Sequence, residues 1–154
     1  MNARFQEIID KLPVFMDRLN NSKVYTREES RLFPDKGIYV FFENGKALYV
    51  GRSDRMKERV KEHGRPSSGH NSATFAFILA KEEAGKSPKK IDIEQDREVL
   101  ECDPAFKPIY HEMKERVSKM QIKVVKVEDP VEQTFFEVYA ALEYDTPYNV
   151  WENH

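Results

Sequence analysis

The spacing of apolar residues predicts a chain built mainly of amphipathic helices. Near the N-terminus, seven apolar side chains recur every three or four residues: Phe5, Ile8, Ile9, Leu12, Phe15, Met16 and Leu19. This periodicity predicts a helix over residues 2–20. The same spacing returns later in a second set: Phe106, Ile109, Tyr110, Met113, Val117 and Met120. A second amphipathic helix is therefore expected over about 106–120.

A different pattern lies between these helices. Two β-prone runs, residues 38–42 and 47–51, flank the segment Glu43-Asn44-Gly45-Lys46. A tight hairpin turn of type I′ needs a positive φ at both central residues, and Asn followed by Gly tolerates this best. The sequence therefore predicts an antiparallel hairpin, and a further β-prone run at 121–127 adds a third strand.

The remaining segments complete a small α+β fold. Further helices are expected over about 54–63, capped by Ser53 or Asp54, over 72–84, stopped by Gly85, and from Asp129-Pro130 to a point before Pro147. Residues 21–35 read as a polar connection, and residues 86–103 as a loop with a short helix. The predicted fold is a three-stranded sheet with an antiparallel N-terminal hairpin, flanked by helices.

Composition limits the class of protein. The chain has 154 residues, of which 40% are hydrophobic and 34% charged, and this balance is typical of a polar globular domain. Its single cysteine excludes an internal disulfide. The longest apolar run, 75–80, is too short to span a membrane, and the charged N-terminus does not resemble a secretion signal. We expect a cytoplasmic protein with no membrane association.

Charge is distributed unevenly along the chain. The net charge is only −2, which is not typical of a nucleic-acid-binding protein. Between Lys46 and Pro66, however, seven basic residues stand against three acidic ones. After Lys126 there is no lysine or arginine, and seven acidic residues follow: Glu128, Asp129, Glu132, Glu137, Glu143, Asp145 and Glu152. The first region suits phosphate groups, and the second suits a cation.

The predicted hairpin carries a recognisable pair of tripeptides. Gly37-Ile38-Tyr39 is followed, ten residues later, by Tyr49-Val50-Gly51. This pair resembles the signature of GIY-YIG nucleases, a family that includes homing endonucleases, restriction enzymes and the incision subunit of bacterial excision repair. The sequence departs from the literal motif only where valine stands for the second isoleucine.

Positions after the hairpin extend the resemblance. The family has a basic residue just after the second tripeptide, an arginine on the next helix and a histidine or tyrosine one turn later. It then has a metal-binding glutamate on a later helix and an asparagine that closes the domain. The matching residues here are Arg52, Arg59, His63, Glu137 and Asn149.

The resemblance also implies a domain organisation. It covers about residues 36–66 and 130–149, and the stretch between them is longer than in the minimal family domain. We therefore expect a single domain over 1–154. Within it, residues 1–30 form an N-terminal helical extension, and residues 36–149 form a GIY-YIG-like nuclease domain with a helical insertion at about 86–120.

Helical geometry gives an independent test of two of these residues. At about 100° per residue, Arg59 and His63 border the apolar stripe formed by Met56 and Val60, while the other charged residues of this helix face away. The alternatives are a hydrogen-bonded core histidine and an arginine that lays its aliphatic stem over apolar surface.

Glu137 can be tested in the same way. One stripe of the last helix carries five apolar residues: Val131, Phe135, Val138, Tyr139 and Leu142. Glu137 lies on the far side, and the helix is apolar or small nearly all round, which predicts burial. A partly buried carboxylate needs a cation, and a divalent metal would supply it. The alternatives are exposure to solvent or pairing with a distant arginine.

The resemblance implies roles for these side chains. Tyr39 would act as general base, with His63 as a proton relay, and Tyr49 would orient the water or the phosphate. Arg59 would offset charge on the phosphate, and Glu137 would hold one Mg²⁺ or Mn²⁺ ion. Three more residues, besides Arg52, are expected to contact the substrate: Gly51, His70 and Asn149. Cross-strand aromatic packing is the structural alternative for the two tyrosines, and helix capping is the alternative for His70.

The sequence thus favours a metal-dependent endonuclease that hydrolyses phosphodiester bonds in nucleic acid, with DNA the expected substrate. Two other functions stay open. One is a nucleic-acid-binding module without cleavage, and the other is a protein-interaction module on the same fold. Oligomeric state does not follow from the sequence.

Overall fold

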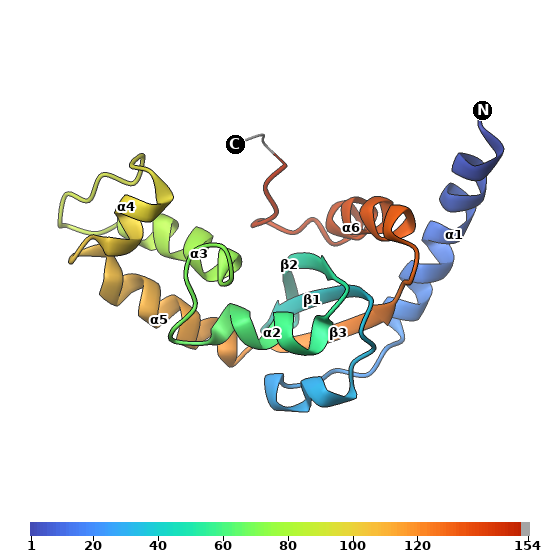
Figure 1. Ribbon diagram of the computed structural model, residues 1–154, viewed down its shortest axis with the longest axis horizontal. Helices are drawn as coiled ribbons and strands as arrows, with labels where there is room; N and C mark the ends of the chain where they lie inside the picture. The colour runs from blue at the N-terminus through green and yellow to red at the C-terminus, as the bar shows by residue number, and fades with distance from the viewer. Residues whose placement is uncertain (152–154) are drawn as a thin grey trace. The chain divides into compact units, whose positions relative to one another are not determined.

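The computed structural model of the chain describes residues 1–151, so Glu152 of the acidic C-terminal segment lies outside the described residues. These residues form two compact units (Figure 1). The first consists of residues 1–58 and 121–151, and the second of residues 59–120. The insertion expected at about 86–120 falls within the second unit.

A three-stranded antiparallel sheet forms the centre of the first unit. Its strands are β1 (Gly37–Glu43), β2 (Lys46–Ser53) and β3 (Gln121–Lys126), in the order β2-β1-β3. The predicted α+β fold is confirmed. Because β1 is central, one long edge of β2 has no neighbouring strand in the sheet, and this edge becomes important for the site.

The hairpin turn has the predicted geometry. Asn44 and Gly45 have φ values of 53° and 77°, so both central residues lie in the left-handed region that a type I′ turn requires. A register shift between Phe41 and Phe42 follows the turn pairs, and beyond this shift Val40 faces Val50 and Tyr39 faces Gly51.

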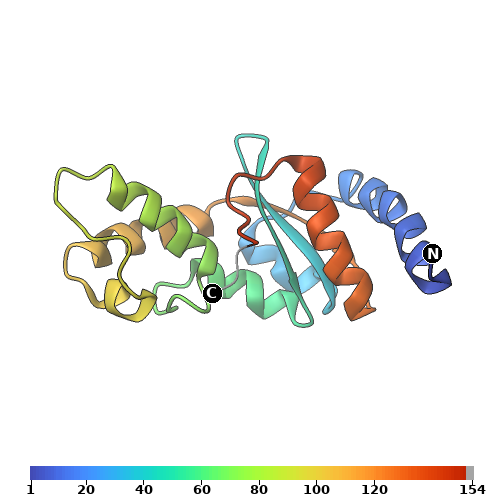
Figure 2. The same ribbon diagram turned by 90° about the horizontal axis from the view of Figure 1, so that it is seen from above.

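The two faces of the sheet have different surroundings. Alternate residues of the strands join a core with the helices: Ile38, Val40, Val50 and Val125. The helices that cover this face are α1 (Ala3–Asn20) and α6 (Pro130–Tyr144), and Figure 2 shows α6 lying along the sheet with α1 beside it. Tyr39 and Tyr49 project from the opposite face, because cross-strand partners and alternate residues share a face.

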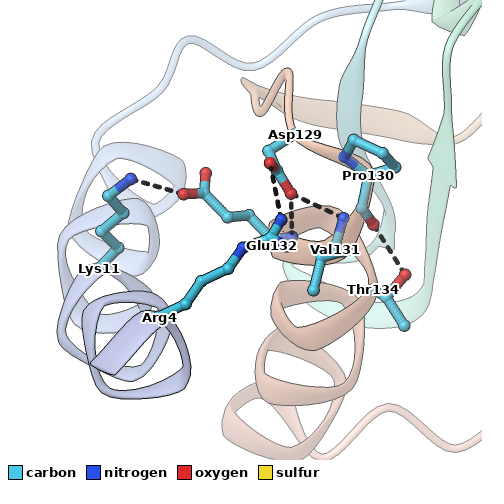
Figure 3. A network of polar contacts seen from close by, with 7 residues as sticks. All are labelled: Arg4, Lys11, Asp129, Pro130, Val131, Glu132 and Thr134. Atoms are coloured by element: carbon cyan, nitrogen blue, oxygen red, sulfur yellow. Dashed lines mark hydrogen bonds and ion pairs between the residues drawn. The ribbon is translucent and has the colours of Figure 1, made fainter. Parts of the chain in front are cut away.

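Polar contacts fix the N-terminus of α6 against α1 (Figure 3). Asp129 is the N-cap, and its Oδ1 accepts hydrogen bonds from the backbone N–H groups of Val131 at 2.8 Å and Glu132 at 3.1 Å. Lys11 of α1 forms an ion pair with Glu132 at 2.5 Å, and Arg4 approaches Asp129 at 3.3 Å. These contacts, with core packing beneath them, determine how α6 lies on the sheet.

The orientation of α6 about its axis differs from the sequence prediction. The apolar residues Val131, Phe135, Val138 and Leu142 are exposed, with Leu142 at 70%. The buried residues are Gln133, Phe136, Ala140 and Ala141. The prediction of burial all round was therefore wrong for this stripe. Small alanines let the helix approach the sheet closely, and this close packing decides which side faces inward.

The connection at 21–35 is more ordered than a polar linker. It contains the 3₁₀ helix η1 (Arg27–Leu32), which begins with a capping box between Thr26 and Glu29. Tyr25 pairs with Ile122 through two backbone hydrogen bonds of 2.8 Å, which extends the free side of β3. This structure could not be predicted from the polar composition of residues 21–35. The hydrogen bonds that form it are either local or made by the backbone alone.

The second unit is helical. Its elements are α2 (Met56–Gly64, which begins in the first unit), α3 (Thr74–Gly85), α4 (Arg97–Cys102) and α5 (Phe106–Ser118). Aromatic rings join α3 to α5, since Phe77 lies 5.4 Å from Phe106 and 5.5 Å from Tyr110 between ring centroids. The predicted helices are found here within about two residues of their expected ends.

None of the helices formed by residues 1–151 is both long and apolar enough to cross a lipid bilayer.

Two adjacent phenylalanines of α6 test which side of the helix faces the core. Phe136 is 0% exposed, whereas Phe135 is 37% exposed and packs only against Phe5 among the rings described for it. Phe136→Ala should lower the free energy of unfolding by about 3–5 kcal/mol. Phe135→Ala should lower it by no more than about 1 kcal/mol. Urea denaturation of both variants measures this, and equal losses would contradict the orientation.

Candidate active site

The free edge of β2 is covered by the segment that follows α6. The Asn149 side chain bonds both polar groups of Val50: its Oδ1 accepts from the Val50 N–H at 2.9 Å, and its Nδ2 donates to the Val50 carbonyl at 2.7 Å. Thr146 Oγ1 donates to the same Oδ1 at 2.7 Å. The Tyr148 N–H donates to the Leu48 carbonyl at 3.3 Å. This segment, residues 146–149, is called the tail. It forms hydrogen bonds with the edge of β2 as a neighbouring strand would.

Glu137 satisfies the next outward-facing group along this edge. Its carboxylate accepts a hydrogen bond from the backbone N–H of Arg52. Burial raises the pKa of the Glu137 carboxyl above its ordinary value, and the positive charge and N–H of Arg52 act in the opposite direction. A single N–H leaves most of the carboxylate's acceptor capacity available. Glu137 is therefore a partly buried carboxylate that can accept a cation or a proton.

Tyr39 lies across Gly51, the residue beside Arg52. A Cβ built on Gly51 would stand 2.2 Å from Cζ and 2.3 Å from the hydroxyl oxygen of Tyr39. Only glycine leaves room for the ring in this position, which gives a physical reason for the last residue of the second tripeptide. Tyr39 is 1% exposed, whereas Tyr49 is half-buried.

These residues approach β2 from two sides, because α6 covers one face of the sheet and the two tyrosines project from the other. The Tyr39 ring covers Gly51, Tyr49 projects from the same face, and Glu137 reaches the edge at Arg52. Asn149 bonds Val50 in the middle of this stretch. The Arg52 side chain is exposed. The Arg52 guanidinium and the half-buried Tyr49 are thus accessible to a ligand, whereas the Tyr39 ring is buried.

Gln133 is a residue of this region that the sequence interpretation missed. It is 1% exposed, and its Nε2 donates to the Val127 carbonyl at 2.7 Å and to Asp54 Oδ1 at 3.2 Å. Gln133 lies one helical turn before Glu137, so it fixes α6 beside the end of β2 and thereby helps to position Glu137. The sequence signal for Gln133 was an amide side chain four residues before Glu137, on the same side of the helix.

Two further predicted residues lie on α2 in the second unit. The Arg59 guanidinium donates to the Ser72 carbonyl at 2.5 Å and contacts Glu62 at 3.3 Å. His63 is fully buried, and its pKa lies well below the ordinary value because of burial and, secondarily, the positive charge of Arg59. His63 is consequently a neutral imidazole at neutral pH.

His70 lies in the loop before α3. Its Nδ1 is 2.5 Å from Glu101 Oε2 of α4. A Cβ on Gly69 would lie 2.8 Å from the other Glu101 oxygen, so the glycine permits this close approach. Glu101 could not be identified from the sequence, because it lies far from His70 along the chain. The pair orients the imidazole of His70.

The nine predicted site residues thus divide between the units. The first unit contains Tyr39, Tyr49, Gly51, Arg52, Glu137 and Asn149. The second contains Arg59, His63 and His70. Within residues 1–151, no group of three or more His, Cys, Asp or Glu side chains is placed to hold a metal ion.

No protein-family model matches the chain, and no curated protein matches it. Two solved structures are similar, both of the GIY-YIG N-terminal endonuclease domain of UvrC from Thermotoga maritima, each a tyrosine-to-phenylalanine mutant bound to its catalytic divalent cation. Each match covers 81% of this chain and 94% of the other, with a TM-score of 0.44 and identities of 16% and 15%. This distant likeness does not establish an activity.

The close packing of Tyr39 on Gly51 can be tested by substitution. Gly51→Ala should lower the free energy of unfolding by about 1–3 kcal/mol, because the added methyl group overlaps the ring. In a Tyr39→Leu background the ring is absent, and the same substitution should cost much less. Thermal denaturation of the four proteins completes the cycle. An equal cost in both backgrounds would show that the ring does not lie on Gly51.

The raised pKa of Glu137 predicts how stability changes with pH. The folded state holds this proton more tightly than the unfolded state, so the ionised form costs stability at neutral pH. Glu137→Gln keeps an acceptor for the Arg52 N–H and should be more stable than the wild type at pH 7 in EDTA. The advantage should shrink as pH falls through the folded pKa and vanish below the ordinary value of 4.5. A difference independent of pH would contradict this assignment.

Proposed function

We propose that this protein is a metal-dependent endonuclease that hydrolyses phosphodiester bonds in nucleic acid, with DNA as the expected substrate. The observation that carries the proposal is the position of Glu137. Its partly buried carboxylate lies at the free edge of β2, at the residue that follows the Tyr49-Val50-Gly51 tripeptide. The tripeptide pair of the hairpin and this carboxylate, far apart in sequence, lie in the same unit, which supports the proposal.

The chemistry of the donor set fits Mg²⁺ or Mn²⁺. Mg²⁺ is often held by one or two carboxylates together with waters and substrate phosphate, so Glu137 alone is an adequate protein ligand. The raised pKa supports this, because a nearby dication stabilises the ionised form that burial disfavours. The bound ion would supply positive charge to the leaving oxygen.

The residues of the first unit then have separate roles. Arg52, exposed beside Glu137, attracts the phosphate and neutralises part of its charge. The Tyr49 hydroxyl, half-buried, orients the phosphate or the attacking water. Tyr39 removes the proton from that water, and its burial means that substrate binding must open access to the hydroxyl. Asn149 holds the β2 edge in place.

The chemistry of their side chains suggests roles in the reaction for the three predicted site residues of the second unit, Arg59, His63 and His70. A neutral His63 can accept a proton, and the Arg59 guanidinium can offset negative charge. His70, oriented by Glu101, can donate to a phosphate oxygen. Arg59→Ala, His63→Gln and His70→Gln in a cleavage assay decide whether each takes part in the reaction.

A protein-interaction module is a second candidate function. The exposed stripe formed by Val131, Phe135, Val138 and Leu142 is the observation that favours it, since contiguous exposed apolar surface often marks an interaction site. Such a module would show no cleavage and no steep salt dependence of nucleic-acid binding. A nucleic-acid-binding module without cleavage would bind nucleic acid with an affinity that falls steeply with salt, and it would show no cleavage.

Plasmid nicking tests the main proposal. Wild type should nick with Mg²⁺ or Mn²⁺ and not with EDTA. Glu137→Ala should lower the rate by about 10²–10³-fold, as expected when a group that stabilises developing charge is removed. Tyr39→Phe should lower it by about 10²–10⁴-fold if the phenol is the general base.

Glu143→Ala is the matched control, because Glu143 is an exposed glutamate on the same helix. It should leave the rate within about twofold of wild type, as for a surface substitution away from the site. Mg²⁺ should also raise the melting temperature of wild type and not of Glu137→Ala. Metal-dependent nicking that survives Glu137→Ala would remove Glu137 from the mechanism.

A further inference from the structure

The second unit contains a cavity that the proposed mechanism does not use. It has a volume of about 420 Å³ and lies between the loop at 66–68 and α5. Lys107, His111 and Lys114 line it from α5. Their spacing of four and three residues places them on one side of the helix. A cavity of this size can hold a small ligand or one group of a larger one.

Lys114 is the most unusual of these side chains. It is 7% exposed, and its ammonium donates to the carbonyls of Pro66 at 2.7 Å and Ser68 at 3.0 Å. The same nitrogen lies 4.2 Å from the ring centroid of Tyr110. Within residues 1–151, no carboxylate is in ion-pair contact with it. Burial accordingly lowers the pKa of Lys114.

The direct contacts of the Lys114 ammonium are therefore neutral oxygens and an aromatic ring, and the Glu101 carboxylate partly offsets its charge without contacting it. Partial desolvation strengthens its field in the cavity relative to that of a surface lysine. An anion in the cavity would stabilise the ammonium further, because burial still outweighs the effect of Glu101 and lowers the pKa of Lys114. The two carbonyl bonds also fix the loop that carries Ser67, which lines the same cavity.

The other charged groups favour an anion as well. Lys107 and His111 are exposed at the cavity, so they remain accessible to a ligand. Glu101 is the one acid among the lining residues, and its carboxylate is already engaged with His70 at 2.5 Å. The lining thus combines two lysines, an imidazole and a serine hydroxyl with a single, paired carboxylate. A cation would be repelled, and a purely apolar ligand would leave the donors unpaired.

We propose that this cavity binds a phosphate group. Phosphate carries close to two negative charges and several strong acceptor oxygens, which match several separate donors better than a carboxylate does. Lys107, His111 and Ser67 would contact it, and Lys114 would contribute charge from behind. The group belongs either to a nucleic-acid strand, which rests on the proposed nuclease function and adds a second grip on the substrate, or to a small phosphate compound.

Phosphate titration followed by NMR tests the site in the full chain. Inorganic phosphate, at constant ionic strength set with chloride, should shift the backbone amides of Ser67, Ser68 and α5 in a saturable way. The double variant Lys107→Gln/His111→Gln should bind phosphate at least about tenfold more weakly, as the loss of one or two charged contacts predicts. Lys119→Gln is the matched control, because Lys119 is exposed just after α5 and pairs with Glu115 instead.

A DNA duplex titration at several salt concentrations identifies the source of the phosphate. If the strand occupies the cavity, the double variant should reduce the slope of log K against log salt by about one to two, and Lys119→Gln should not. If the variant loses inorganic phosphate but keeps the duplex slope, the site stands and its ligand is a small phosphate compound. The absence of saturable shifts in wild type, or equal phosphate affinity in the double variant, overturns the proposal.

These outcomes are separate from those of the nuclease proposal. Wild type that nicks DNA but gives no phosphate shifts would remove the cavity site and leave the endonuclease intact. Wild type that binds phosphate but never nicks DNA would support the cavity site and contradict the endonuclease proposal. Lys107→Gln alone, an exposed change, supplies a second variant should the double variant fold poorly.

Discussion

The candidate site depends on one constraint, the need to satisfy the backbone hydrogen-bonding groups at the free edge of β2. An edge strand presents backbone groups that must bond to water or to protein. Here the tail bonds Leu48 and Val50, and the Glu137 carboxylate takes the N–H of Arg52. This last bond brings a carboxylate from the C-terminal helix to the hairpin. The bond that completes the edge therefore also places the group proposed to hold the metal.

Much of the fold could be predicted because its signals are local. The Asn44-Gly45 turn follows from the φ values that these residues tolerate, and the helices follow from apolar periodicity. The orientation of α6 could not be predicted in this way. Phe135 and Phe136 are equally apolar, yet only the second is buried. Shape decides between them, since small alanines allow close contact with the sheet, and periodicity does not measure shape.

The candidate site could likewise be predicted from the sequence only in part. The tripeptides identified the hairpin, and the reason for Gly51 became clear only from the Tyr39 ring that covers it. Gln133 and Glu101 were missed because each acts through a partner distant in sequence. Such contacts arise from tertiary packing, and one sequence carries no direct record of them. Residue type predicted the candidates, and the structure supplied their partners.

The most direct test of the central claim is to locate a bound divalent ion. Mn²⁺ broadens the NMR signals of nuclei near it. If the Glu137 carboxylate holds the ion at the β2 edge, low concentrations of Mn²⁺ should broaden the amide signals of Gly51 and Arg52 first, and this effect should disappear in Glu137→Ala. Broadening that persists in that variant, or that first appears in another part of the protein, would contradict the account.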